Sequence, residues 1–249
     1  MPASNGEVGG PGERVVDGEA PGVCVPEGGE VLLKLQDIGP RTNSWTEWTP
    51  RRSSTVEQVH GLAVDLEYAL AAYEAIDKEV SIRDRRWVVI HVNQASDAQI
   101  RRMQALGVIA TVVPGFLWMA SDRYGLGQLG AEAIPIRRML DGGVPVALST
   151  DGVPNSMLWT AWEAIARWDD DGQRQLGDSQ LTREEALRMA AQSGHHLTWN
   201  EERYGSLEVG KVADMVVLAE DPLSCDLHRL KDIRVDLTFL GGRQVFGPT

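Results

Sequence analysis

The sequence predicts an α/β protein built around a parallel β-sheet. Short apolar runs typical of buried strands alternate along the chain with segments of helical period, so that each strand is followed by a helix. Several of these runs end abruptly in polar residues, as strands do where a parallel sheet carries its chemistry. After about residue 204 the pattern changes to short β segments separated by turns, which indicates a small antiparallel unit at the C-terminus.

Composition limits the class of protein. A chain of 249 residues is long enough to bury the core of one α/β domain. Its net charge of −12 disfavours a surface for nucleic acid or for an anionic membrane. Cys24 and Cys225 are too far apart in the sequence to indicate a disulfide framework or a local metal motif. With no long apolar run and no secretory leader visible, we expect a cytoplasmic protein that binds neither nucleic acid nor membrane.

The chain divides into three expected regions. Residues 1–29 are rich in glycine, proline and acidic residues and have no sustained period, so we expect a flexible N-terminal segment. Residues 30–203 form the α/β body, and residues 204–249 form the C-terminal β unit. Five strand-then-helix units fit either a doubly wound sheet or part of a (β/α) barrel, which has eight. The five strands are expected near residues 31, 55, 87, 108 and 144.

Five helices are expected to follow these strands. The last of them has the clearest boundaries, because Thr182 and Glu185 form a capping box at its start and Gly194 is typical of a helix end. This boundary places His195 and His196 in a connection outside the helix. The expected helices cover residues 64–76, 96–106, 134–140, 156–168 and 182–194.

The segment Val144–Asn155, VPVALSTDGVPN, predicts a strand that presents a carboxylate. Its apolar run stops at Ser149, and Asp151 follows just before a glycine and a proline turn the chain. One interpretation is a buried parallel strand with Asp151 at its carboxyl end, in a site. The other is that Asp151 only caps the following turn or helix. The segment alone leaves both open.

Four residues at or near the ends of predicted parallel strands are candidate metal ligands: Lys34, His60, His91 and Asp151. In a barrel, such strand ends converge on one face, so residues distant in sequence become neighbours. Imidazole nitrogens and carboxylate oxygens suit a divalent metal such as zinc. The alternative is that the histidines are ordinary core residues and that the lysine is an edge-strand charge.

Aromatic residues fall in segments expected on the same face of the sheet. Trp45, Trp48, Trp118 and Trp159 lie in such segments, and Phe116 is close to one of them in sequence. They either pack around the rim or form an apolar pocket for a substrate with a bulky hydrophobic group. On the second interpretation, Phe116, Trp118 and Trp159 are the candidate substrate-binding residues.

The C-terminal part of the chain resembles a known family. YGSLEVGKVADMVVLAEDPLS, from Tyr204, and LKDIRVDLTFLGGRQVF, from Leu230, resemble the C-terminal end of the metal-dependent amidohydrolase superfamily, in the amidohydrolase-3 branch that includes the N-substituted formamide deformylases. The resemblance extends over residues 31–246. It implies an incomplete (β/α) TIM-type barrel over residues 30–203, with a C-terminal segment of a composite β-sandwich over residues 204–249.

The same resemblance implies roles for the strand-end residues. VALSTDGVP resembles the strand-8 segment of the family, so Asp151 matches its metal-binding aspartate and general base. His60 and His91 match two single histidine ligands, and Lys34 matches the lysine that bridges metals when carboxylated. The implied activity is hydrolysis of an amide- or formamide-type C–N bond in a small, aromatic substrate, with one or two zinc ions.

One family feature has no counterpart here. The family's first strand carries an H-x-H pair that binds metal, and no H-x-H occurs in this sequence. The alternative function is therefore a truncated or degenerate, non-catalytic relative that acts as a partner subunit or is a gene fragment. Such a chain is expected to form a homo-oligomer or to associate with a complementing N-terminal fragment.

Overall fold

The computed structural model of the chain consists of two compact units, Met1–Arg51 and Arg52–Thr249. It describes residues 13–14, 23–26, 32–33, 57–59, 63–120, 129, 132–151, 154–169, 172, 176 and 181–248.

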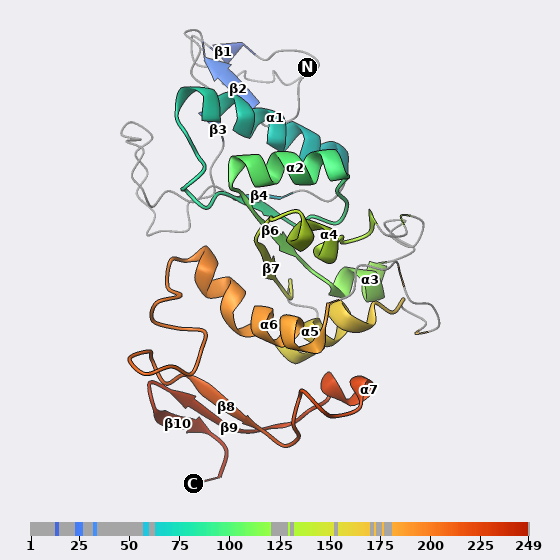
Figure 1. Cartoon of the computed structure of the whole chain (residues 1–249), viewed down its shortest axis with the longest axis vertical. Helices are drawn as coiled ribbons and strands as arrows, with labels where there is room; N and C mark the ends of the chain where they lie inside the picture. Colours follow the sequence, from blue (N-terminus) through green and yellow to red (C-terminus); the bar gives the residue numbers. More distant parts are fainter. Residues whose placement is uncertain are drawn as a thin grey trace, which may run out of the picture. The chain divides into compact units, whose positions relative to one another are not determined.

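The second unit contains a four-stranded parallel sheet with the order β4-β5-β6-β7 (Figure 1). All three pairings within it are parallel, as the alternation of strands and helices predicted. Every residue of β6 and β7 is buried, as expected for the apolar strands of a sheet covered on both faces. The described part of this sheet is open and is not a closed barrel. Its strands are β4 (Glu57–Val59), β5 (Val88–Ile90), β6 (Ile109–Val112) and β7 (Val146–Leu148).

Five helices follow these strands, at the places expected. Figure 1 shows α1 and α2 lying side by side, and α5 and α6 lying together beside β7. The α1 helix buries the whole side chain of Tyr73, whose hydroxyl donates to the Val88 carbonyl at 3.1 Å. No helix in the described residues is long and apolar enough to cross a membrane. The helices are α1 (Ala63–Glu79), α2 (Asp97–Leu106), α4 (Ile136–Asp141), α5 (Met157–Ala166) and α6 (Arg183–Leu197).

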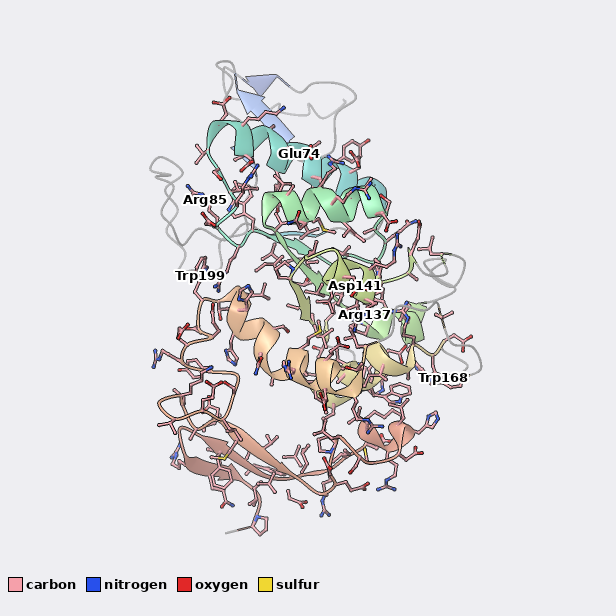
Figure 2. The ribbon with its side chains drawn as sticks, viewed as in Figure 1. Glu74, Arg85, Arg137, Asp141, Trp168 and Trp199 are labelled. Atoms are coloured by element: carbon pink, nitrogen blue, oxygen red, sulfur yellow. The ribbon has the colours of Figure 1, made fainter. Side chains whose placement is uncertain are left out.

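The beginning of α6 confirms the predicted capping box. The Thr182 hydroxyl accepts from the Glu185 backbone N–H, and the Glu185 carboxylate accepts from the Thr182 backbone N–H at 2.8 Å. Arg137 of α4 also donates to this carboxylate, and its guanidinium lowers the pKa of Glu185 to about 2. Figure 2 labels Arg137 beside Asp141, its partner one turn along α4 at 3.3 Å.

The predicted end of this helix is wrong. The helix continues through Gly194 to Leu197, so His195 and His196 lie in its last turn. Glycine in a helix interior costs about 1 kcal/mol relative to alanine but does not forbid the conformation. A Cβ atom at Gly194 would meet no atom within 4 Å, so no close contact explains the glycine.

Two short helices were not predicted. The α3 helix (Gly115–Ala120) lies between β6 and α4, and α7 (Leu227–Leu230) lies in the C-terminal region. Both helices have six residues or fewer, so the sequence shows little helical period over them.

The first unit contains a three-stranded antiparallel sheet, β1-β2-β3. The strand expected from Val31 was predicted to be the first of five parallel strands, and this is wrong: Leu32–Leu33 pairs antiparallel with β2. An apolar run indicates a strand but carries no information on its partner or direction. Lys34 and most of residues 1–29 lie outside the described residues. The strands are β1 (Glu13–Arg14), β2 (Val23–Pro26) and β3 (Leu32–Leu33).

The C-terminal residues form the predicted antiparallel unit, with the order β10-β9-β8. Gly241 and Gly242, both with positive φ, form the tight turn between β9 and β10. This part of the chain is anchored by Leu230 and Ile233, which are buried against Trp162 and Ala166 of α5. The strands are β8 (Met215–Leu218), β9 (Val235–Leu240) and β10 (Arg243–Phe246).

The outer edge of β7 is covered by a helix and not by another described strand. The Leu148 backbone N–H donates to the Ser193 hydroxyl of α6 at 3.3 Å, and that hydroxyl donates to the Met189 carbonyl at 2.6 Å. Leu148 is buried, so its N–H needs this partner. The helix therefore protects an edge that would otherwise present an unpaired N–H group.

Candidate active site

The structure brings two of the predicted site residues together at the carboxyl end of the parallel sheet. His91 directly follows β5, and Asp151 lies three residues after β7. Their side chains meet, with 3.9 Å between His91 Nε2 and Asp151 Oδ1. The imidazole is 21% exposed and the carboxylate 49% exposed, so solvent reaches both groups. The strand-end position predicted for these two residues is thus observed.

Both residues have an unusual backbone conformation. The φ angle is 59° at His91 and 46° at Asp151, in the left-handed region that non-glycine residues rarely adopt. Hydrogen bonds from the next two residues fix the His91 backbone: the Val92 N–H donates to the Thr111 carbonyl at 3.0 Å, and the Asn93 N–H donates to the His91 carbonyl at 2.7 Å. Such strain persists only where the surroundings impose it, and it is concentrated at functional sites.

An aromatic ring fixes the imidazole from a second direction. The rings of Phe116, on α3, and His91 have centroids 5.4 Å apart and an interplanar angle of 76°, which is an edge-on contact. Phe116 is one of the three predicted substrate-binding residues, and the structure places it beside a predicted metal ligand.

The other two predicted substrate-binding residues belong to a tryptophan cluster, which we define as Trp118, Trp159 and Trp162. Their ring centroids are 5.6–6.3 Å apart, and each pair is in edge contact. The cluster packs with Leu230 at the buried contact between α5 and the C-terminal residues. Trp118 and Trp159 thus have a packing contact, and their contact with a substrate stays a prediction.

His60 and Lys34 lie outside the described residues, so only part of the predicted ligand set has a described geometry. Among the described residues, no three His, Cys, Asp or Glu side chains form a group that could hold a metal ion. His91 and Asp151 are compatible with one: they offer nitrogen and oxygen donors, and 3.9 Å lies within the span of an ion with bonds of about 2.0–2.2 Å. The strand before His60, β4, ends at the same level of the sheet as β5, because their last residues, Val59 and Ile90, pair with each other.

Two buried charged residues near the end of α5 were missed by the sequence analysis. Glu163 and Arg167 have no exposed surface. Burial raises the pKa of the Glu163 carboxyl to about 9, against the opposing effects of the Arg167 charge and of a hydrogen bond from the Trp168 backbone. A signal was present: Glu163 is the single charged residue in the otherwise apolar helix MLWTAWEAIA.

Comparison with known proteins decides the family. The model of the amidohydrolase family matches residues 61–246. The chain belongs to the amidohydrolase family. It is 32% identical over 196 residues to an N-substituted formamide deformylase of Arthrobacter pascens, covering 74% of this chain and 35% of that protein. An imidazolonepropionase of a Geobacillus species is 35% identical over 127 residues, covering 51% of this chain and 26% of that protein. The predicted superfamily and its formamide deformylase-like branch are confirmed.

Solved structures agree on the fold. A metal-dependent hydrolase of Pyrococcus horikoshii is similar with a TM-score of 0.58 and 21% identity, covering 70% of this amidohydrolase chain and 35% of the other. At this identity the likeness shows the fold alone, an α/β architecture of the TIM-barrel type. The chain spans about a third of the length of the deformylase and of this hydrolase.

Proposed function

We propose that this chain carries part of the active site of a metal-dependent amidohydrolase that cleaves an amide- or formamide-type C–N bond in a small molecule. The observation that supports this most directly is the pairing of His91 and Asp151. Two strands separated by β6 present an imidazole and a carboxylate 3.9 Å apart, and both residues are held in the left-handed conformation.

The proposed metal ligands are His91, Asp151, His60 and Lys34. When bound, one or two divalent ions such as zinc would supply Lewis-acid activation of a water molecule and of the scissile carbonyl. His91 would offer its Nε2 lone pair to the ion, and the edge of Phe116 keeps the imidazole facing Asp151. This preference for one orientation reduces the cost of ordering the ligand when the ion binds.

Asp151 has a second role in the proposal, as the base. Its carboxylate accepts a proton from the attacking water and donates it to the nitrogen of the leaving group, so the proton count balances across the hydrolysis. The 49% exposure of this side chain leaves room for water and substrate beside it. Asp151 is therefore the proposed catalytic residue.

The substrate class is proposed from the surroundings of the site and from the relatives. Phe116 offers an apolar edge next to His91, which favours a substrate with an aromatic or other apolar group. Trp118 and Trp159 are half-buried, and we propose that their exposed parts extend this apolar surface. The names of the two curated relatives, a formamide deformylase and an imidazolonepropionase, are consistent with a small amide-like substrate.

Metal binding by the full chain tests the proposal. The metal-free protein is titrated with Zn²⁺ by calorimetry, and hydrolysis of N-substituted formamides is followed with the zinc-loaded protein. We expect His91→Ala and Asp151→Asn to weaken zinc binding at least tenfold, because the first removes a donor atom and the second replaces an anionic oxygen donor with a neutral amide. His228→Ala is the control, since His228 is an exposed histidine on α7.

The proposal is contradicted if the wild-type chain binds no zinc, or if the three variants bind it equally. Zinc binding without hydrolysis supports the ligand assignment and favours the non-catalytic alternative.

A partner role is favoured by one further observation. The C-terminal sheet exposes five large apolar side chains, and these lie on both of its faces because successive strand residues such as Val216 and Val217 point in opposite directions. Large exposed apolar surface often marks an interaction site. We propose that a second copy of the chain or a complementing N-terminal fragment covers them, in addition to the small-molecule substrate. Light scattering of the purified chain tests the first option, for which a dimer is the expected result. The exposed residues are Val216, Val217, Leu240, Val245 and Phe246.

A further inference from the structure

Among the described residues, the non-glycine residues with a left-handed backbone conformation occur in small groups. Six residues have this conformation, and four of the six form two contacting pairs near the candidate active site, His91 with Asp151 and Ile134 with Arg167. Asn93 links the two pairs, because it forms backbone hydrogen bonds with both Ile134 and His91. Ile134 is the most unusual, because a β-branched side chain makes a φ of 43° costly. Strain of this kind requires surrounding interactions that hold it in place.

Arg167 supplies those interactions. Its side chain is fully buried at the end of α5, and its guanidinium donates to three backbone carbonyls. Nε donates to the Leu176 carbonyl at 2.6 Å, Nη1 to the Ile134 carbonyl at 3.1 Å, and Nη2 to the Ala133 carbonyl. The planar guanidinium presents its donors in a rigid fork, so it fixes the two successive carbonyls of Ala133 and Ile134 relative to each other.

The segment held by Arg167 continues directly to the site. The Ile134 N–H donates to the Asn93 carbonyl at 2.8 Å, and Ala133 forms an antiparallel bridge with Gln94. Asn93 in turn donates its N–H to the His91 carbonyl at 2.7 Å. A continuous path of hydrogen bonds therefore runs from the guanidinium through Ile134 and Asn93 to the backbone of His91.

We propose that Arg167 is a positioning residue for His91: its guanidinium holds the Ala133–Ile134 carbonyls, and these hold the strained turn that directs the imidazole toward Asp151. The proposal rests on the proposed function for the identity of the site, but the mechanical link from Arg167 to His91 stands apart from any metal. Arg167 touches neither substrate nor metal in this assignment and acts only through the backbone.

The chain offers a matched control in Arg86. This residue also has a left-handed φ, of 51°, and its guanidinium also donates to a distant backbone carbonyl, that of His196. It stacks on Trp199 at 3.7 Å and pairs with Glu201. Figure 2 labels Trp199 beyond the end of α6 and Trp168, the neighbour of Arg167 in sequence, on the opposite side of the view. The variant Arg86→Met therefore shows the effect of losing a similar arginine at a place distant from Arg167.

The test compares Arg167→Met, Arg167→Lys and Arg86→Met in the full metal-free chain. The first readout is the imidazole NMR signal of His91, assigned with His91→Ala, whose shift reports the Phe116 ring beside it. We expect Arg167→Met to move or broaden this signal and Arg86→Met to leave it in place. Arg167→Lys should give a smaller change, because an ammonium cannot hold three carbonyls in a fixed fork.

The second readout is the affinity for Co²⁺, used as a spectroscopic probe. At temperatures where the variants are equally folded, we expect Arg167→Met to weaken Co²⁺ binding about tenfold or more, a typical loss for a residue that orients a ligand, and Arg86→Met to change it less than twofold. If Arg167→Met does not fold, Arg167→Lys carries both measurements.

An unchanged His91 signal in the Arg167 variants overturns the inference, as does an equal response to Arg86→Met. Two results can occur together: the wild-type chain binds no Co²⁺, and the His91 signal differs between wild type and Arg167→Met. The first result contradicts the proposed metal site, and the second still supports the positioning role of Arg167. The two failures are therefore distinguishable.

Discussion

At the scale of single residues, Glu163 shows how burial sets the chemistry of a side chain. Its carboxyl group has no exposed surface and is removed from water. A charged carboxylate in such a place is costly, so burial raises the pKa from its ordinary 4.5 to about 9. Glu163 is therefore neutral at physiological pH, and the buried charge next to it belongs to Arg167.

This pKa predicts how stability changes with pH. Between about pH 4.5 and 9, the folded state keeps the Glu163 proton while the unfolded state releases it, so this residue makes the chain less stable as pH rises. The glutamine side chain in Glu163→Gln cannot ionise. The free energy of unfolding of this variant should therefore fall less than that of wild type as pH rises. The gap to wild type should widen by up to about 1.4 kcal/mol per pH unit. Urea unfolding at pH 5.5, 7 and 8.5 measures it.

The control for this prediction is Glu202→Gln, which changes an exposed glutamate in the same way. Its unfolding free energy should follow wild type at every pH. Parallel curves for wild type and Glu163→Gln would contradict the assignment of a neutral, buried carboxyl.

The sequence predicted the site residues that depend on local pattern and missed those that depend on packing. His91 and Asp151 end apolar runs, so their place at the carboxyl ends of strands followed from the chain itself. Their 3.9 Å contact needed a tertiary fold. Arg167 has no local signal, because an arginine at the end of a helix is normally exposed, and only the folded structure brings its three carbonyl partners together.

At the scale of secondary-structure elements, the contact between α6 and β7 carries a second prediction. Ser193→Ala removes the acceptor of the buried Leu148 N–H and should lower the free energy of unfolding by about 1–3 kcal/mol, the cost of leaving a buried donor unpaired. Ser193→Thr keeps the hydroxyl and should lose less. Urea unfolding measures both, and hydrogen exchange at the Leu148 amide should accelerate only in the alanine variant. Equal exchange rates would show that the helix does not protect this edge.

Elements were predicted where several turns or a buried run made the pattern strong. The four parallel strands and the four helices of ten or more residues follow from such patterns, whereas the six residues of α3 show none. The end of α6 was predicted wrongly at Gly194, because glycine is common at helix ends but does not have to end a helix. The antiparallel pairing of Leu32–Leu33 was missed because pairing is decided by residues far away in the chain.

At the scale of the whole chain, the buried contact between α5 and the C-terminal residues predicts how the second unit is held together. Leu230 is fully buried against the side of α5 that carries Trp162. Leu230→Ala should cost about 2–5 kcal/mol, the range for a leucine truncated in a core. Because few other described core residues join these parts, we expect the loss to appear first as faster hydrogen exchange in residues 215–246, measured by mass spectrometry.

Leu207→Ala provides the comparison, since Leu207 is 75% exposed and lies outside the C-terminal strands. A change of less than about 0.5 kcal/mol is expected there. Equal losses for the two leucines would mean that the contact at Leu230 does not hold the C-terminal strands.

The tryptophan cluster also gives this contact an optical signature. Indole rings with centroids 5.6–6.3 Å apart are close enough for their excited states to couple, and the fixed, non-parallel orientation of Trp118, Trp159 and Trp162 makes that coupling chiral. The folded chain should therefore show a paired positive and negative band in the circular dichroism of its indoles. Since the cluster lies where α5 meets Leu230, the couplet should disappear when the C-terminal residues detach, even while the parallel sheet keeps its backbone spectrum.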